Sequence, residues 1–585
     1  MEFVLLILQV IVLLGAIFIG IRLGGMAIGY AGGFGVVVLC LILGMNPGAI
    51  PWDVILIIMS VIAAIAAMQL AGGLDYMVQI AEKILRKNPK YINYLAPAVT
   101  YFLTFLAGTG HTAFSMIPVI VEVAKEQNIK PSAPLSIAVV SSQIAITASP
   151  VSAAVIYMSG VLEPLGWSYP TLLLVWLITT FSACMLCAFV INTFFPLDLS
   201  KDAIYQQRLK AGLVKQPLGA QQIQLKKGAK LSVGIFLIGV FCVVIYATSI
   251  SDVVRKPMLA YLDKHIPIYI DKELDSIQAK GFAKLQIQDE NLISEVRAQI
   301  SQALESAKVS FRDNQTSIKA ALLGADNSSL EALKMQLEEA QGHINAIKRT
   351  AENAPALDFI ESALSELNVH KEHILEDWAQ KEGIFATLCS FVKSYIDPVR
   401  LPRDGAIISF MLLIATLITL CCKVESGKLL DQSTFKAGMT ACVCVLGVAW
   451  LGNTFVGGYK DEIGILAASL VKEYPALLAV ALFFASMLLY SQAATAKAIM
   501  PVVIGALGIS TANTESAYIL VASFAAVSAL FVLPTYPTLL GAVQMDDTGS
   551  TRIGKYVFNH SFILPGILAI TFSVTLGFIV APLFA

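Results

Sequence analysis

Long apolar stretches dominate this chain, and short polar segments separate them. A helix that crosses a bilayer needs about 20 apolar residues. Ten stretches reach that length, at residues 3–21, 27–45, 53–71, 134–160, 170–196, 231–250, 405–422, 436–456, 514–541 and 557–583. The pattern predicts an all-α polytopic membrane protein, and the start of the chain is expected to be a first spanning helix rather than a removed signal peptide.

Two further apolar stretches, 92–124 and 476–508, are interrupted by small and polar residues. We interpret each as a re-entrant hairpin of two half-helices joined by a tip. The alternative is two ordinary spans in each stretch. Non-helical backbone at membrane depth must line a cavity or be buried in protein, because lipid cannot satisfy its N–H and C=O groups.

The two hairpin tips resemble each other in sequence. Residues 108–119 align with residues 491–502 without a gap, and Thr112 matches Thr495. Interrupted segments at corresponding places in two halves of a chain are typical of the binding site of a secondary transporter. The sequence therefore predicts two structural repeats with a site between them.

Basic residues gather in a few of the polar loops, and they predict the topology. The basic positions are Lys83, Arg86, Lys87, Lys90, Lys125, Lys130, the segment 201–230, Lys423, Lys428 and Lys436. All should be cytoplasmic under the positive-inside rule. Hairpins that return to the side they entered satisfy this rule. Both termini are then periplasmic, and two inverted five-helix repeats are expected, at 1–250 and 403–585.

Residues 251–402 differ in composition from the rest of the chain. They are rich in charged residues, Gln and Ala, and their apolar positions recur at helical spacing. These positions are Leu285, Ile287, Ile293, Val296, Ile300 and Leu304. We expect an inserted soluble domain of three or so amphipathic helices, coiled-coil-like and extracytoplasmic. A structural or oligomerising role and a sensing role both remain open.

Each hairpin is followed by a span with a proline-containing break, at 141–152 and at 533–538. Proline removes a backbone donor and opens the helix. The opened helix leaves N–H groups and a positive dipole end that attract anions, and its free carbonyls can hold Na⁺. Further partners are the hydroxyls of Thr147, Ser149, Ser152, Thr535 and Thr538. The alternative is that these residues only kink a packed helix.

Two cations lie within the hairpins, His111 at the first tip and Lys497 on the second limb of the other. Ionisable groups inside a membrane are costly and usually functional. Either cation could pair with a carboxylate. The alternatives are that His111 forms only a structural hydrogen bond, and that Lys497 snorkels or pairs with a protein carbonyl. No Asp or Glu lies in the tips or breaks, which favours an anionic substrate over a cationic one.

Composition excludes several other classes of protein. The chain is 57% hydrophobic and 14% charged, and its formal net charge of −1 argues against a nucleic-acid partner. No metalloprotease or serine-hydrolase motif occurs in the spans, so no enzyme activity and no bound metal or organic cofactor are predicted. The Cys184 and Cys187 pair is interpreted as helix packing, and no disulfides are expected.

Several long motifs resemble the anaerobic C4-dicarboxylate transporters, the Dcu family of bacterial inner membranes. The motifs are residues 72–91, 108–111, 148–152, 491–494, 533–537 and 559–566. The resemblance covers about 1–250 and 403–585. It implies uptake, exchange or efflux of fumarate, succinate, malate or aspartate. It also implies a carboxylate and cation site made by two tips and two breaks, as in divalent-anion/sodium symporters.

The resemblance assigns substrate binding to twelve residues. They are Thr109, Gly110, His111, Thr112, Ser149, Pro150, Ser152, Ser491, Gln492, Thr495, Thr535 and Thr538. The insert and Lys497 depart from the family pattern, and Lys497 is a candidate charge partner. We expect a homodimeric elevator- or rocking-type exchanger, coupled to Na⁺ or H⁺ or to neither. A dicarboxylate sensor that signals through the insert is the alternative.

Overall fold

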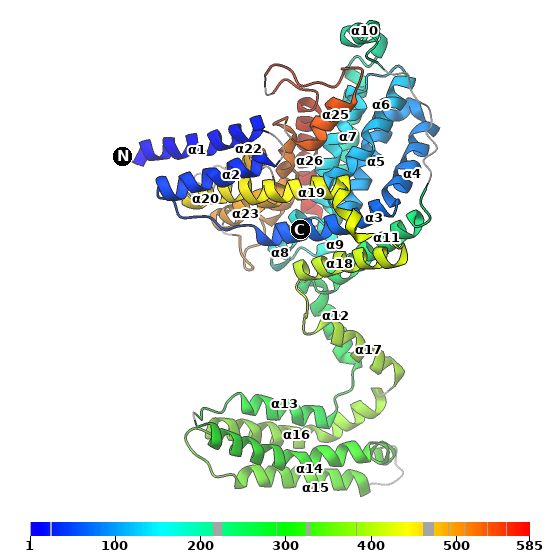
Figure 1. Cartoon of the computed structure of the whole chain (residues 1–585). Helices are drawn as coiled ribbons and strands as arrows, with labels where there is room; N and C mark the ends of the chain where they lie inside the picture. The colour runs from blue at the N-terminus through cyan, green and yellow to red at the C-terminus, as the bar shows by residue number, and fades with distance from the viewer. Residues whose placement is uncertain are drawn as a thin grey trace. The chain divides into compact units, whose positions relative to one another are not determined.

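The computed structural model divides the chain into two compact units, Met1–Val254 with Leu401–Ala585, and Arg255–Arg400 (Figure 1). It describes residues 2–23, 26–214, 225–287, 289–322, 328–381, 383–459, 473–489, 491–507, 509–534, 536–556 and 558–584. The second unit covers the segment for which the sequence predicts an inserted domain. The first unit contains the apolar helices and the two interrupted segments.

Seven of the ten predicted spans are confirmed, within the described residues, as helices long and apolar enough to cross a membrane. They are α3 (Trp52–Leu70), Ser132–Leu165 with α7 and α8, α9 (Tyr169–Phe194), α11 (Ala229–Ser249), α18 (Arg403–Cys421), Ser433–Gly458 with α19 and α20, and Ile563–Leu583 with α26. The chain is thus an all-α multi-pass membrane protein.

Of the other three predicted spans, two are shorter than expected, and the first is a 22-residue helix that covers the predicted 3–21. Their apolar helical parts are Val4–Gly20 in α1 (Glu2–Leu23), Ala27–Ile42 with α2 (Ala27–Val37), and Ala517–Phe531 with α24 (Ala517–Ser523). The second stops because the sequence Gly44-Met45-Asn46-Pro47-Gly48 cannot continue a helix. The third stops because the proline-containing break follows it directly.

The first interrupted segment consists of two short helices around a break. Helix α5 (Ile92–Ala107) ends at Gly108, whose φ of 69° lies in the left-handed region that favours glycine. A 3₁₀ turn (η3, Gly110–Ser115) leads into α6 (Ile117–Glu126).

Arg86 in the preceding helix α4 (Gly73–Lys87) pairs with Glu122 at 3.3 Å and Glu126 at 2.8 Å. Because α5 begins five residues after α4 ends, this contact places the end of α6 beside the start of α5. The segment therefore returns towards the level at which it began.

The second interrupted segment also consists of two short helices. Helix α22 (Leu477–Leu489) is followed by α23 (Gln492–Leu507). Neither limb is long enough to cross a bilayer by itself. Residues 460–472, which precede α22, lie outside the described residues.

Two helices of the first unit are broken along their length. Helix α7 (Ser132–Ile144) tightens into a 3₁₀ turn (η4, Ala145–Ala148), unwinds, and resumes as α8 (Ala153–Leu162). Helix α24 likewise tightens into η9 (Phe524–Phe531), unwinds, and resumes as α25 (Pro537–Met545). Helices α9 and α26 (Ile563–Val580) pack against each other and against these broken helices (Figure 1).

Close helix packing joins the two halves of the sequence. Glycines Gly29 and Gly32 of α2 contact Gly447 in a π-helical turn, η8 (Val445–Ala449), and an added Cβ at any of the three would overlap the facing backbone. Small residues at helix contacts in membrane proteins allow such close approach. The contact fixes α2 against the α19–α20 segment (α19, Ser433–Cys444; α20, Trp450–Gly458).

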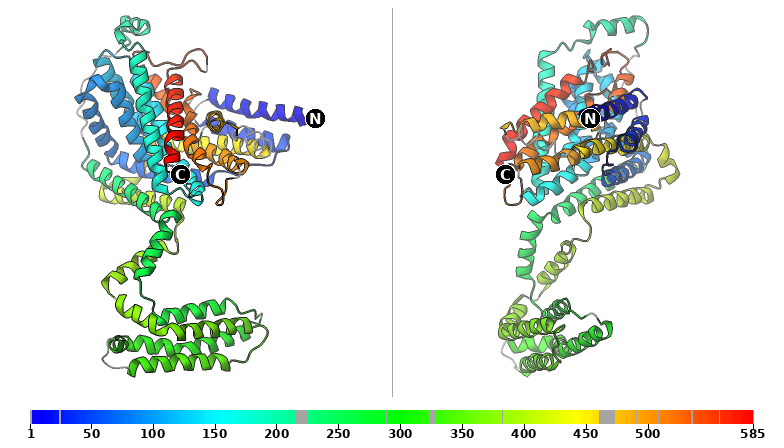
Figure 2. Two further views of the ribbon diagram at one scale, coloured as in Figure 1. Left: turned by 180° about the vertical axis from the view of Figure 1, so that it is seen from behind. Right: turned by 90° about the vertical axis from the view of Figure 1, so that its left-hand side faces the viewer.

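The second unit contains a bundle of four helices (green in Figure 2), namely α13 (Ile270–Phe282), α14 (Glu290–Leu322), α15 (Ser328–Ala346) and α16 (Ala354–Lys381). Its own core includes Phe311 and Trp378, which are fully buried. A separate pair, α12 (Asp252–His265) and α17 (Ile384–Ile396), packs around Leu262 and Cys389. The expectation of three or so helices was too low, because turns within the charged sequence carry few strong breakers.

Replacing Gly447 with valine should destabilise the first unit, because the new side chain would overlap the Gly29 backbone. We expect a loss of about 1–3 kcal/mol, seen as a lower melting temperature of the purified protein. Gly33→Val on the same helix α2 is the control, because a Cβ at Gly33 meets no atom within 4 Å. Equal melting temperatures for the two variants would contradict the close packing.

Candidate functional site

A cavity of about 420 Å³ lies where the two interrupted segments meet the two broken helices. Polar lining comes from Thr109 at the first tip, Ser152 at the first break, and Ser491 and Gln492 at the second tip. Tyr536 and Pro537 line it from the second break. The two tips and the two breaks, which were identified separately in the sequence, thus all line one cavity.

The first break presents the start of helix α8 to the cavity. Ser149 and Ser152 have extended backbone, and the Ser152 hydroxyl accepts a hydrogen bond from the Val155 N–H at 3.2 Å. The Ser149 hydroxyl accepts one from the Val151 N–H at 3.4 Å. Ala153, the first residue of α8, lines the cavity. The first N–H groups of a helix have no intrahelical partner and favour an anion.

The second break presents the start of α25 in the same way. Pro537 is the first helical residue, and extended Tyr536 precedes it. Thr538 is fully buried, and its hydroxyl has no hydrogen-bond partner among the described residues. The first tip packs here, because the Phe114 ring lies directly against Gly541. Thr535 lies outside the described residues.

Gln492 holds the second tip against both broken helices. Its amide nitrogen donates to the Gln143 carbonyl at 2.7 Å and to the Ser528 hydroxyl at 3.0 Å. Ser491 begins α23 by accepting a hydrogen bond from the Ala494 N–H at 3.3 Å, and the Thr495 hydroxyl donates to the Ser491 carbonyl at 2.7 Å. Thr495 therefore supports the tip rather than lining the cavity.

The first tip packs on the first break. A Cβ on Gly108 would lie 2.8 Å from the Val151 side chain, and Gly110 lies over Ser142. Thr109 lines the cavity. The backbones of His111 and Thr112 belong to η3, and their side chains lie outside the description.

Tyr169 is a supporting residue that sequence reasoning missed. Its hydroxyl donates to the Pro150 carbonyl at 2.6 Å, and both groups are buried. The Arg403 guanidinium lies 5.0 Å from the Tyr169 ring and binds Glu163 at 2.5 Å and the Ser159 hydroxyl at 2.9 Å. The sequence offered one signal that a supporting residue is needed here: the Pro150 carbonyl lies in a break, and an unwound carbonyl requires a donor at membrane depth.

Lys497 does not line the cavity. Its ammonium pairs with the Asp53 carboxylate at the start of α3 and lies 5.5 Å from the centre of the Tyr157 ring. The sequence left several partners open for Lys497, and the structure shows that it pairs with a carboxylate. The described lining of the cavity contains no charged side chain. Within this described lining, positive potential comes from helix N-termini and N–H groups.

The model of a family described as anaerobic C4-dicarboxylate membrane transporter matches residues 5–271 and 383–585 of this chain. The chain belongs to this family. The unmatched stretch, 272–382, coincides with most of the four-helix bundle. The cavity and all its lining residues lie in the matched part.

Named relatives agree with this membership. The chain is 50% identical to the C4-dicarboxylate transporter DcuA of Helicobacter pylori (strain J99) over 575 residues, or 98% of each chain. It is 48% identical to DcuA of Wolinella succinogenes over 99% of this chain and 100% of the relative. It is 43% identical to DcuA of Escherichia coli K12 over 98% of this chain and 99% of the relative. No solved structure matches the chain.

Replacing Tyr169 with phenylalanine should leave the buried Pro150 carbonyl of this transporter-family chain without its donor. Such a loss costs about 1–3 kcal/mol and should loosen the first break. We expect a lower melting temperature together with a several-fold rise in KM for uptake of a C4-dicarboxylate into proteoliposomes.

Tyr101→Phe is the matched control, because Tyr101 is also fully buried and its hydroxyl lies 2.6 Å from that of Thr180, away from the cavity. It should lower the melting temperature and leave KM unchanged. A KM change of the same size in both variants would show that Tyr169 affects stability alone.

Proposed function

We propose that this chain is a secondary active transporter that exchanges C4-dicarboxylates across a bacterial inner membrane. Fumarate, succinate, malate and aspartate are the proposed substrates. Family membership and the printed names of the relatives support the substrate class. The observation that carries the proposal is the convergence of two tips and two unwound helices on one cavity.

A small dianion would bind between the starts of α8 and α25. One carboxylate would accept hydrogen bonds from the first N–H groups of α8. The other would accept one from the Thr538 N–H of α25, because Pro537 has no N–H and the Leu539 N–H donates to the Tyr536 carbonyl. The dipole of each helix also favours the anion. The hydroxyls of Thr109, Ser152 and Ser491 and the Gln492 amide supply further polar contacts from the lining. Binding through hydroxyls and N–H groups gives each carboxylate directional contacts without a fixed counter-ion.

The cavity has a polar side and an apolar side, which suits alternating access. The polar side belongs to the tips and breaks. The apolar side comes from α2, α3 and η8, through Ile28, Val61 and Val445 respectively. An apolar wall makes few directional contacts. The part of the first unit that contains the two interrupted segments and the broken helices could therefore slide or rock along this wall. We propose that the two hairpins are re-entrant and belong to inverted repeats.

Orientation follows from the basic loops. We propose that the ends bearing Arg86, Lys125 and Lys130 are cytoplasmic, that both termini are periplasmic, and that the second unit is extracytoplasmic. We also propose a homodimer.

Gln143 supports coupling to a cation. Its side chain is fully buried beside the second tip, and neither its amide nitrogen nor its oxygen has a hydrogen-bond partner among the described residues. Buried polar groups are nearly always paired. We propose that the Gln143 amide oxygen and neighbouring carbonyls hold either Na⁺ or an ordered water between the broken helices.

Counterflow tests the proposed exchange and its site. Proteoliposomes loaded with succinate should take up labelled fumarate or aspartate from outside. Ser491→Val, which places two methyl groups at the cavity wall, should reduce uptake at least tenfold. Thr179→Val on α9 is the control, because Thr179 is buried outside the cavity lining and bonds only to backbone carbonyls.

Uptake by the Ser491→Val protein at the control rate would exclude the proposed site. Uptake that needs no internal succinate would exclude exchange as the main mode. An imposed Na⁺ gradient should accelerate net uptake if Gln143 lies at a coupling site. A rate independent of Na⁺ would leave an ordered water as the partner of Gln143.

The alternative function, a dicarboxylate sensor, rests on the separate second unit. Lys393 pairs with Asp263 at 2.6 Å, so deleting 264–392 and joining these positions by a short linker should preserve the flanking helices. Because the cavity lies in the first unit, we expect transport to continue at nearly the full rate. Loss of transport by a variant that still reaches the membrane would show that the second unit is needed for it. Retained transport with loss of a fumarate-dependent transcriptional response would support the sensor role.

A further inference from the structure

A second cavity, of about 340 Å³, lies at the opposite end of α9 from Tyr169. The end of α9, the start of α7 and the start of α26 surround it. Its polar lining includes Lys130, Ser132, Asp202, Arg552 and Asn559. None of these residues lines the substrate cavity. The proposed function therefore leaves this cavity without a role.

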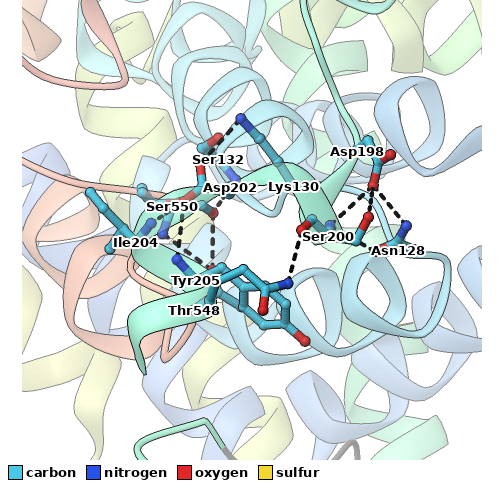
Figure 3. A network of polar contacts seen from close by, with 12 residues as sticks. Asn128, Lys130, Ser132, Asp198, Ser200, Asp202, Ile204, Tyr205, Thr548 and Ser550 are labelled. Carbon is cyan, nitrogen blue, oxygen red and sulfur yellow. Dashed lines mark hydrogen bonds and ion pairs between the residues drawn. The ribbon is translucent and has the colours of Figure 1, made fainter. Parts of the chain in front are cut away.

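One wall of this cavity is fixed by a network of polar contacts (Figure 3). The Lys130 ammonium pairs with the Asp202 carboxylate at 3.1 Å. Burial raises the pKa of Asp202, but hydrogen bonds from the Tyr205 amide and Lys130 outweigh it, so the net pKa is lowered. The Ser550 hydroxyl accepts from the Ser132 N–H at 3.1 Å. Lys130 is thus held at the cavity by an ionised partner.

The opposite wall is a short hairpin from Arg552 to Ser561. The Arg552 N–H donates to the Ser561 hydroxyl at 3.0 Å, and the Ser561 N–H donates to the Arg552 carbonyl at 3.1 Å. These contacts fix the backbone of Arg552 at the cavity. The Arg552 side chain is exposed and forms no ion pair with any described residue.

Beyond these contacts the hairpin carries residues typical of a membrane interface. Tyr556 is 70% exposed and Phe558 is 60% exposed, and Lys555 precedes them. Tyrosine and other amphipathic aromatic residues concentrate at the headgroup level of bilayers, together with basic residues on the cytoplasmic side. The hairpin is therefore placed to meet phospholipid headgroups.

The third side of the cavity is apolar, and this apolar surface continues along the outside of α9 and α26 in the first unit. Phe195 and Leu564 line the cavity and are themselves exposed. Exposed apolar residues follow on both helices, with Phe189 and Phe194 on α9 and Ile567 on α26. Apolar side chains in these positions on a membrane helix face lipid tails.

We propose that this cavity binds an anionic phospholipid, with its phosphate at Arg552 and Lys130 and its acyl chains along α9 and α26. The two cations exceed the single carboxylate of Asp202 by one charge, which matches a phosphodiester. Basic pockets between transmembrane helices on the cytoplasmic side are suited to such headgroups. The proposal depends on the membrane setting of α9 and α26 and does not require the proposed exchange.

Binding can be measured by native mass spectrometry of the delipidated full-length protein. The probes are phosphatidylglycerol, phosphatidylcholine and, as a soluble anion, glycerol 3-phosphate. We expect phosphatidylglycerol to bind more tightly than either of the others. Arg552→Gln should weaken it about fivefold, which corresponds to about 1 kcal/mol for one basic residue near the headgroup.

Lys555→Gln is the matched control, because it removes the same charge from the same hairpin, and Lys555 does not line the cavity. Because Lys555 lies near the headgroups but outside the cavity, its loss should weaken phosphatidylglycerol binding clearly less than Arg552→Gln does. Equal binding of the two lipids, or an equal effect of the two substitutions, would overturn the proposal. Glycerol 3-phosphate that binds as tightly as phosphatidylglycerol would show a site for a free anion and would overturn the lipid assignment. Comparable melting temperatures of the two variants establish that both are folded.

Discussion

Backbone that unwinds inside an apolar protein must find hydrogen-bond partners, and this constraint organises the first unit. Lipid offers none, so each exposed N–H or C=O group must meet protein, substrate or an ordered water. Tyr169 satisfies the Pro150 carbonyl, Ser152 satisfies the Val155 N–H, and Gln492 satisfies the Gln143 carbonyl. The starts of α8 and α25 are left facing the cavity, and an anionic guest is the partner that their dipoles favour.

The placement of charge follows from the same constraint. A lysine side chain in the cavity would hold an anion too firmly for release on the other side of the membrane. Lys497 is instead neutralised by Asp53, and Arg403 by Glu163. Partial charges at helix ends are weaker than a full cation. Under the proposed exchange, such partial charges would hold both carboxylates of a substrate and still allow their release.

Much of the fold could be predicted from local pattern. Apolar length gave seven of the ten spans, and the change to a charged, helical composition located the segment that forms the second unit. Short motifs led to Thr109, Ser152, Ser491 and Gln492, because a polar interruption of an apolar run is visible in the sequence. All four line one cavity.

Contacts between distant residues could not be predicted in this way. The partner of Lys497 is Asp53, far away in the first half of the chain, and the donor to Pro150 lies at the start of α9, beyond α8. The unwound Pro150 carbonyl indicates that a donor is needed. The local sequence does not identify Tyr169 or Asp53 as the partner, because other tyrosines and aspartates also lie near helix ends. Helix ends were also misjudged where a turn or break shortens an apolar run, as after Ile42 and Phe531.

A cryo-electron microscopy map of the protein with bound fumarate tests the central claim most directly. The account predicts elongated density in the cavity, with one carboxylate within about 3 Å of the first N–H groups of α8 and the other at the start of α25. Density for fumarate at another place, with the cavity closed by continuous helices through 145–153 and 531–537, would contradict it.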